Sequence, residues 1–237
     1  MRPDAASFVL VPGAGGDAWY WHRVVPLLEP HAAAVVAIAL PAADESLGWR
    51  EYADVVVNSA AGLDNVVLVA QSMAAFSAPL AADRLPVRHL VLVAPMIPAP
   101  GETGAEWWQA TGQVEAQRAA AIAEGRDPDA EFDVLEMFMH DVPQDVVLEA
   151  MSRPEPRQAE RPFLEPWPLD AWPEIDTSVI AGRGDRLFPF AFMVELASKR
   201  LGVECVALDA GHLLALSRPA ELTGEIVRCI ASRTPRR

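Results

Sequence analysis

The stretch VLVAQSMAAF, at residues 67–76, joins an apolar run to small residues that favour a helix. Such a strand-to-helix junction is the repeating unit of a parallel sheet that carries helices on its faces. A serine, Ser72, stands at the junction. It can be a nucleophile exposed on a sharp turn, or a residue that caps the following helix through its side chain. The stretch alone does not separate these two interpretations.

Similar apolar runs recur along the chain, and they are nearly continuous in hydrophobicity rather than alternating. This is typical of strands that are buried on both faces of a sheet. The runs are SFVLV (7–11), AVVAIAL (34–40), NVVLVA (65–70), HLVLVA (89–94), TSVIA (177–181) and VECVAL (203–208). Helix-length segments lie between them, at about 18–29, 49–61, 73–85, 189–201 and 219–232. The alternation predicts an α/β fold with a doubly wound, mostly parallel sheet.

The alternation stops between the strand at 89–94 and the strand at 177–181. Three helical patterns occupy this stretch, at about 105–125, 129–140 and 143–152, and a proline-rich segment follows them. We therefore expect a core domain formed by residues 1–95 and 171–237. Residues 96–170 are expected to form a small helical cap inserted into that core.

Composition narrows the possible partners. The 237 residues carry a formal net charge of −14 and a pI near 4.7, which argues against nucleic acid and anionic membranes. The two cysteines have no metal-ligand spacing and are expected to be packed thiols in a reducing compartment. No apolar leader or bilayer-length segment is present, so the expected location is cytoplasmic. Neither a metal nor another cofactor is expected, and a monomer and a homodimer are both open.

Ligands of open parallel sheets bind beyond the carboxyl ends of the strands, so the residues that follow each strand are the candidates. The first strand is followed by PGAGG, at residues 12–16. Its glycines can expose backbone N–H groups as an oxyanion loop, with Ala14 as the donor. A phosphate loop and a plain turn are the alternatives, although neither the dinucleotide glycine spacing nor a following lysine is present. At the serine junction, the Met73 N–H at the helix start is a second candidate oxyanion donor.

Two further polar residues follow later strands. Asp185 lies in AGRGD after the strand at 177–181, and His212 lies in DAGH after the last strand. Each alone is as compatible with a turn or a cap as with catalysis. Ser72, Asp185 and His212 together reproduce the order nucleophile, acid and histidine, each after a strand, which favours a catalytic triad. His22 and His89 are expected to be structural, whereas His140 in the cap is a candidate pocket residue.

With these residues in place, the sequence resembles the α/β-hydrolase superfamily over nearly its whole length. It is most similar to the small esterases related to plant methylesterases and hydroxynitrile lyases, and to their bacterial relatives. FVLVPGAGGDAWYWHRVVPLL resembles the opening of that branch, GRGDRLFP its acid segment, AGHLLALSRPAEL its histidine segment, and FMHDVPQDVVLEAM a cap stretch. In three places the chain departs from the family pattern. Pro12 replaces the usual loop histidine, and Ala70 and Ala74 replace the two elbow glycines.

The resemblance implies a serine hydrolase that cleaves a small carboxylic ester through an acyl-enzyme. Lyases of this branch carry a threonine and a lysine where this chain has Gly13 and Leu213, which disfavours lyase chemistry. A thioesterase of a biosynthetic pathway is the main alternative, because editing thioesterases have a similar Ala-Gly-Gly loop. A lyase or a ligand-binding protein on the same fold is also open. The expected substrate pocket is lined by Gly13, Gly15, Gln71, Trp107, Trp108, Phe138, His140 and Leu213.

Overall fold

The computed structural model describes residues 5–231 of the chain. The start of the N-terminal stretch (1–4) and the last residue of the helix expected at 219–232 lie outside this range. Six strands form one sheet in the order β2-β1-β3-β4-β5-β6, and all five pairings are parallel. The strands are β1 (Ala6–Val11), β2 (Ala32–Ala37), β3 (Val66–Gln71), β4 (Val87–Val93), β5 (Thr177–Gly182) and β6 (Cys205–Leu208). The predicted doubly wound α/β fold is confirmed.

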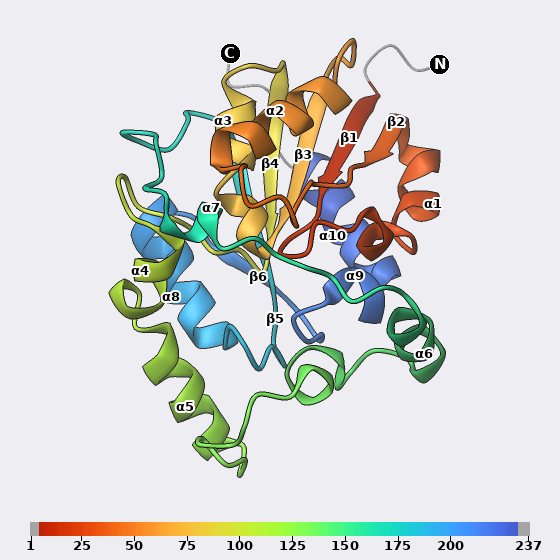
Figure 1. Cartoon of the computed structure of the whole chain (residues 1–237). Coiled ribbons are helices and arrows are strands. Elements are labelled where there is room, and N and C mark those ends of the chain that lie inside the picture. The colour runs from red at the N-terminus through yellow and green to blue at the C-terminus, as the bar shows by residue number, and fades with distance from the viewer. Residues whose placement is uncertain (1–4, 232–237) are drawn as a thin grey trace.

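The two faces of the sheet are covered by separate groups of helices (Figure 1). One face packs against α2 (Trp49–Ser59), α3 (Ala78–Ala82) and α8 (Phe190–Leu201). The other packs against α1 (Val25–Leu28), α9 (Leu214–Ser217) and α10 (Pro219–Ala231). The central strands β1 and β3 are buried along their whole length, which explains why their sequences are continuously apolar.

Two helices expected from the sequence are interrupted in the structure. The segment at 18–29 forms a 3₁₀ turn (Ala18–Trp21) followed by the short helix α1, which has Pro26 in its first turn. The segment at 73–85 likewise forms a 3₁₀ turn (Ser72–Ala75) and then α3, with Pro79 in its first turn. Proline lacks the N–H that a helix interior needs, so in each segment it starts a new helix instead of continuing the old one.

The edge strand β2 also ends earlier than its apolar sequence suggests. Beyond Ala37, the Ile38 N–H donates to Leu10 O at 3.1 Å, and the Leu40 N–H donates to Gly16 O at 2.9 Å. Ile38 thus still bonds to β1, whereas Leu40 bonds to the loop after β1. This contact fixes the loop against the chain that follows β2.

The segment inserted between β4 and β5 runs along the carboxyl end of the sheet (Figure 1). Its helices are α4 (Gly104–Ala110), α5 (Gln113–Ala123), α6 (Gln144–Ser152) and α7 (Arg161–Leu164), together with a π-helical turn (Leu135–Met139). The expected helix at 105–125 is divided at Gly112, which has φ +72°. The expected helix at 129–140 is reduced to the π-helical turn. Whether this segment is a separate cap stays a prediction.

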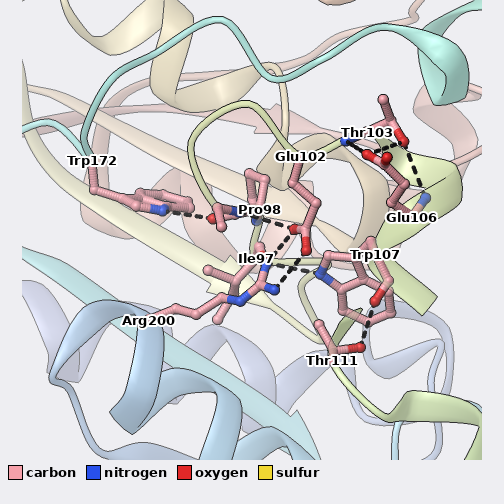
Figure 2. Close-up of polar contacts among 10 residues, drawn as sticks. Ile97, Pro98, Glu102, Thr103, Glu106, Trp107, Thr111, Trp172 and Arg200 are labelled. Atoms are coloured by element: carbon pink, nitrogen blue, oxygen red, sulfur yellow. Dashed lines mark hydrogen bonds and ion pairs between the residues drawn. The ribbon is translucent and has the colours of Figure 1, made fainter. Parts of the chain in front are cut away.

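A buried ion pair anchors the start of the inserted segment to α8 (Figure 2). Arg200 of α8 donates from Nη2 to Glu102 Oε1 at 2.8 Å, and their side chains are only 13% and 8% exposed. The Ala99 N–H donates to the second oxygen of Glu102 at 3.0 Å. Trp107 of α4 is fully buried beside this pair and donates its indole N–H to Ile97 O. Trp107 therefore belongs to the core at the base of the segment.

Replacing Arg200 with methionine is expected to lower the free energy of unfolding by about 3–5 kcal/mol, because Glu102 would keep its buried charge without a counter-ion. Urea unfolding followed by circular dichroism measures this change. Arg84→Met is the matched control, since Arg84 pairs with Asp54 while both side chains are about half exposed. That control should cost less than about 1 kcal/mol. Equal losses in the two variants would contradict a structural role for the buried pair.

Candidate active site

Ser72 lies at the joint between β3 and a 3₁₀ turn, and its backbone has φ +52°. Such a conformation is uncommon for a residue with a side chain, and it occurs mainly in strained turns and functional sites. The Ser72 carbonyl accepts a hydrogen bond from the Met96 N–H at 3.0 Å, which ties the turn to the chain after β4. The flanking Ala70 and Ala74 are both buried, so their methyl groups are accommodated in the core.

His212 and Asp185 form a buried pair at the ends of the two adjacent strands β6 and β5. His212 Nδ1 lies 2.8 Å from Asp185 Oδ2, and the two side chains are 3% and 0% exposed. The other oxygen, Asp185 Oδ1, accepts the N–H groups of Leu187 and Phe188, both at 2.9 Å. The carboxylate is therefore held on both oxygens, and its position fixes the imidazole ring.

Two phenylalanine rings complete the surroundings of His212. The ring of Phe188 meets the imidazole edge-on at 5.0 Å, and the ring of Phe138 from the inserted segment lies at 5.4 Å. Phe188 also contacts the buried ring of Trp107, which in turn contacts Trp108. Of the predicted aromatic pocket residues, Phe138 thus contacts the histidine directly, and the two tryptophans lie behind Phe188.

The loop after β1 lies beside the serine turn. The Gly13 N–H donates to Gln71 Oε1 at 3.0 Å, and the Gly15 N–H donates to Gln158 Oε1 at 3.1 Å. The Gly16 N–H donates to Gly13 O at 3.1 Å. Ala14 is exposed, and within the described residues its N–H makes no hydrogen bond. One donor of this loop is thus left free for a ligand, between neighbours that are held in place.

Gln71 connects this loop to the histidine. Its Nε2 lies 3.2 Å from His212 Nε2, while its Oε1 accepts the Gly13 N–H. Gln71 is buried, with 5% of its surface exposed. Gln71, predicted as a pocket residue, therefore has its carboxamide bonded on one side to the loop after β1 and on the other to the imidazole.

Asp141, in the inserted segment, is a residue that the sequence analysis did not single out. Its Oδ2 accepts the N–H of Gly211 at 2.7 Å, directly before His212. Its Oδ1 is buried and, among the described residues, has no hydrogen-bond partner. The neighbouring His140 is exposed and lies against the same loop, since a Cβ on Gly211 would approach its Cε1 to 2.9 Å. The motif HDVP was the available signal for Asp141, although it gives no contact.

Tyr20 lies beside the loop that carries His212, and the carboxylates of Asp185 and Asp141 affect the pKa of its hydroxyl. It is buried, and its hydroxyl accepts the Ala215 N–H at 3.4 Å. Burial raises the pKa of the Tyr20 hydroxyl well above its usual value, and the negative charges of Asp185 and Asp141 raise this pKa further. The phenol is therefore neutral at physiological pH. The two histidines predicted to be structural bond to protein groups away from this site: His22 to Trp19 O, and His89 of β4 to the Ser178 hydroxyl of β5.

Gly182, the last residue of β5, allows the histidine loop to approach the acid loop. A Cβ at this position would lie 2.2 Å from Ala210 O and 2.5 Å from Gly211 O. Gly182→Ala is expected to lower the free energy of unfolding by roughly 1–3 kcal/mol, since the backbone must move. Gly224→Ala in α10 is the control, because a Cβ there meets nothing within 4 Å. The control should gain about 1 kcal/mol from helix propensity. Thermal unfolding of both variants checks this, and an unchanged midpoint for Gly182→Ala would contradict it.

The described residues contain no group of three or more His, Cys, Asp or Glu side chains that could hold a metal ion. No helix within residues 5–231 has the length and apolar character needed to cross a bilayer.

Comparison with known proteins matches residues 8–225 to the model of the alpha/beta hydrolase family. Methylesterase 7 of Arabidopsis thaliana is 36% identical over 110 residues, which is 41% of this chain and 42% of that protein. The matched part is therefore less than half of this curated relative.

Two solved structures resemble the chain over most of its length. Polyneuridine aldehyde esterase superposes with a TM-score of 0.75 at 18% identity, covering 94% of this chain and 98% of that one. A pyrethroid hydrolase from Sphingobium faniae JZ-2 superposes with a TM-score of 0.72 at 21% identity, covering 96% and 99%. At these identities the superpositions establish a shared fold.

Proposed function

This chain belongs to the alpha/beta hydrolase family, and from that premise we propose that it is a serine esterase that cleaves a small carboxylic ester. The observation that carries the proposal is the strained backbone of Ser72, at φ +52° on the turn after β3. A helix cap needs only extended backbone, whereas a nucleophile elbow needs the sharp turn that exposes the hydroxyl. The names of the esterase relatives support the same reaction class.

In the proposed mechanism, the Ser72 hydroxyl attacks the ester carbonyl as His212 accepts its proton. Asp185 supports this role, because the 2.8 Å contact with Nδ1 keeps the proton on that nitrogen and leaves the lone pair on Nε2. Asp185 also stabilises the imidazolium that forms. The protonated His212 then gives its proton to the leaving alcohol, and the same residue activates the water that releases the acid.

The proposed oxyanion site uses the N–H groups of Ala14 and Met73. The free N–H of Ala14 supports this role, since the neighbouring glycine N–H groups are already bonded within the protein. Met73 follows the nucleophile at the start of the 3₁₀ turn, where an N–H has no acceptor inside the helix. Loss of one such donor typically costs roughly 10²- to 10³-fold in rate.

Lyase chemistry is disfavoured by the surroundings of Gly13. A Cβ at this position would lie 2.2 Å from Gln71 Oε1, so a threonine here would displace that side chain. Leu213 supplies no charge beside the histidine. Ester cleavage with water as the final acceptor therefore fits the residues best. In this proposal the inserted segment is a cap, with Phe138 contributing an apolar wall beside His212.

A panel of p-nitrophenyl esters of increasing acyl length, run beside acyl thioesters in ¹⁸O-labelled water, tests the reaction class. We expect turnover of the esters, with one labelled oxygen in the released acid. Faster turnover of thioesters than of matched oxygen esters would favour a thioesterase. Product without the label would identify a non-hydrolytic reaction, and absence of any turnover would favour a ligand-binding protein.

A further inference from the structure

The side chain of Gln71 occupies a position between the two halves of the proposed active site. Gln71 is the last residue of β3, directly before Ser72. Its carboxamide bridges the loop after β1 and the imidazole of His212, through the contacts of 3.0 Å to the Gly13 N–H and 3.2 Å to His212 Nε2. Gln71 is buried, with only 5% of the residue exposed.

The direction of both hydrogen bonds is fixed by the chemistry of the partners. A backbone N–H can only donate, so the carboxamide atom that faces Gly13 must be the oxygen. The NH₂ group of Gln71 must then face His212. Because His212 Nδ1 holds its proton against Asp185, Nε2 is an acceptor and receives a hydrogen from Gln71.

Glycine at position 13 is part of this arrangement. A Cβ there would approach Gln71 Oε1 to 2.2 Å and the Cβ of Ser72 to 3.1 Å. The carboxamide thus fills the space that any other residue at position 13 would need. Among the described residues, the polar partners of the imidazole are Asp185 and Gln71, and the rings of Phe138 and Phe188 cover it elsewhere.

Resting on the mechanism proposed above, we propose that Gln71 is a positioning residue that sets the spacing between the oxyanion loop and the Nε2 edge of His212. It acts on the loop through Gly13, whose neighbour Ala14 carries the proposed oxyanion donor. It acts on the base by holding the imidazole ring in place before the attack and by favouring the tautomer that Asp185 also selects. Two groups that must meet the same substrate carbonyl are thereby held by one rigid carboxamide.

The contact with His212 must open during each turnover. Nε2 has one lone pair, and the Ser72 hydroxyl needs it at the moment of attack. Once His212 is protonated, its Nε2–H and the NH₂ of Gln71 are both donors and no longer attract one another. Gln71 therefore positions the free enzyme and the approach to attack, without taking part in bond making.

Three variants separate this role from simple packing. Gln71→Met keeps the volume and loses both hydrogen bonds. Gln71→Glu keeps an acceptor for the Gly13 N–H and loses the donor to His212. Gln158→Met is the matched control, because Gln158 accepts the Gly15 N–H of the same loop and is not among the polar partners of His212.

Steady-state kinetics on the best ester of the panel should show a kcat lowered roughly 10- to 100-fold in both Gln71 variants, with KM within about twofold. Long-range ¹H–¹⁵N spectra of the free, histidine-labelled proteins provide a second readout. The neutral His212 Nε2 signal, assigned by its loss in His212→Ala, should move downfield in Gln71→Met and stay in place in Gln158→Met.

The opposite results would overturn the proposal. Wild-type kcat in Gln71→Met would mean that the side chain only fills space. Wild-type kcat in Gln71→Glu would mean that the bond to Gly13 suffices and the bond to His212 does not contribute. An unmoved Nε2 signal in Gln71→Met would show that the contact does not exist in solution. Fluorophosphonate labelling keeps the two proposals apart, since labelling at a residue other than Ser72 overturns the mechanism, whereas the spectra still report on Gln71.

Discussion

Replacing Ser72 with alanine is expected to lower kcat/KM by roughly 10⁴- to 10⁶-fold and to abolish covalent labelling by a fluorophosphonate. In the proposed mechanism the hydroxyl oxygen of Ser72 forms the acyl-enzyme, and an alanine methyl group cannot replace it. Intact-mass spectrometry after labelling and ester hydrolysis assays measure the two effects. The rate that remains should come from the oxyanion donors and from substrate binding alone.

Ser77→Ala is the matched control for this experiment. Ser77 lies five residues further along the same segment and is fully buried, and its hydroxyl donates to Ala74 O at 3.4 Å. The Ser77→Ala variant should be labelled to the same extent as the wild-type protein. Equal labelling of the Ser72→Ala and wild-type proteins would contradict the assignment of the nucleophile and leave Ser72 as a turn residue.

The change Asp185→Asn is expected to lower kcat by about 10⁴-fold while the fold persists. The backbone N–H groups of Leu187 and Phe188 require an acceptor, so the asparagine oxygen will face them. Its NH₂ group will then face His212 Nδ1 and force that nitrogen to accept. The proton moves to Nε2, and the lone pair needed for proton abstraction is lost.

Asp209→Asn provides the control for the change in charge. Asp209 follows the adjacent strand β6 and pairs with Arg183 at 3.3 Å, with its side chain 90% exposed. It removes the same charge near the same edge of the sheet and should lose less than about twofold in kcat. A similar loss in both variants would show that general electrostatics, and not the tautomer of His212, explains the effect.

The sequence predicted the strands well because a parallel sheet leaves a strong local signal. The strands β1 and β3 are buried along their whole length, so their apolar runs are continuous. The edge strand β2 is only partly buried, and it ends before its apolar run does. The carboxyl ends of parallel strands lie along one edge, which is why Asp185 and His212 could be expected to meet although 27 residues separate them. The fold and the contact between Asp185 and His212 could therefore be predicted from the sequence, whereas the role of Ser72 as the nucleophile stays a prediction.

Contacts made by a side chain across the sheet leave no such signal. Glutamine is a common polar residue, and the position before the serine of a nucleophile elbow is not specified by the motif. Only the structure shows that Gln71 bridges Gly13 and His212. Asp141 is 70 residues away from the loop that it holds, and no spacing rule connects the two. Pro26 and Pro79 interrupt two expected helices. The apolar pattern continues on either side of each proline, so the sequence predicted one helix in each place.

The return path of the inserted segment is bonded to the loop after β1 and to the chain that follows β2. Arg153 pairs with Asp17 at 2.7 Å, Gln158 binds the Gly15 N–H, and the Ala159 N–H donates to Ala42 O at 2.6 Å. Even Pro156 packs so closely that a Cβ on Gly15 would touch it at 2.6 Å. For protein engineering of the proposed esterase, the glycine loop and the insert are then expected to set the substrate range together. A chimera that exchanges residues 96–170 with those of a relative must therefore exchange the glycine loop as well. Otherwise the contacts between the new segment and the loop after β1 are lost.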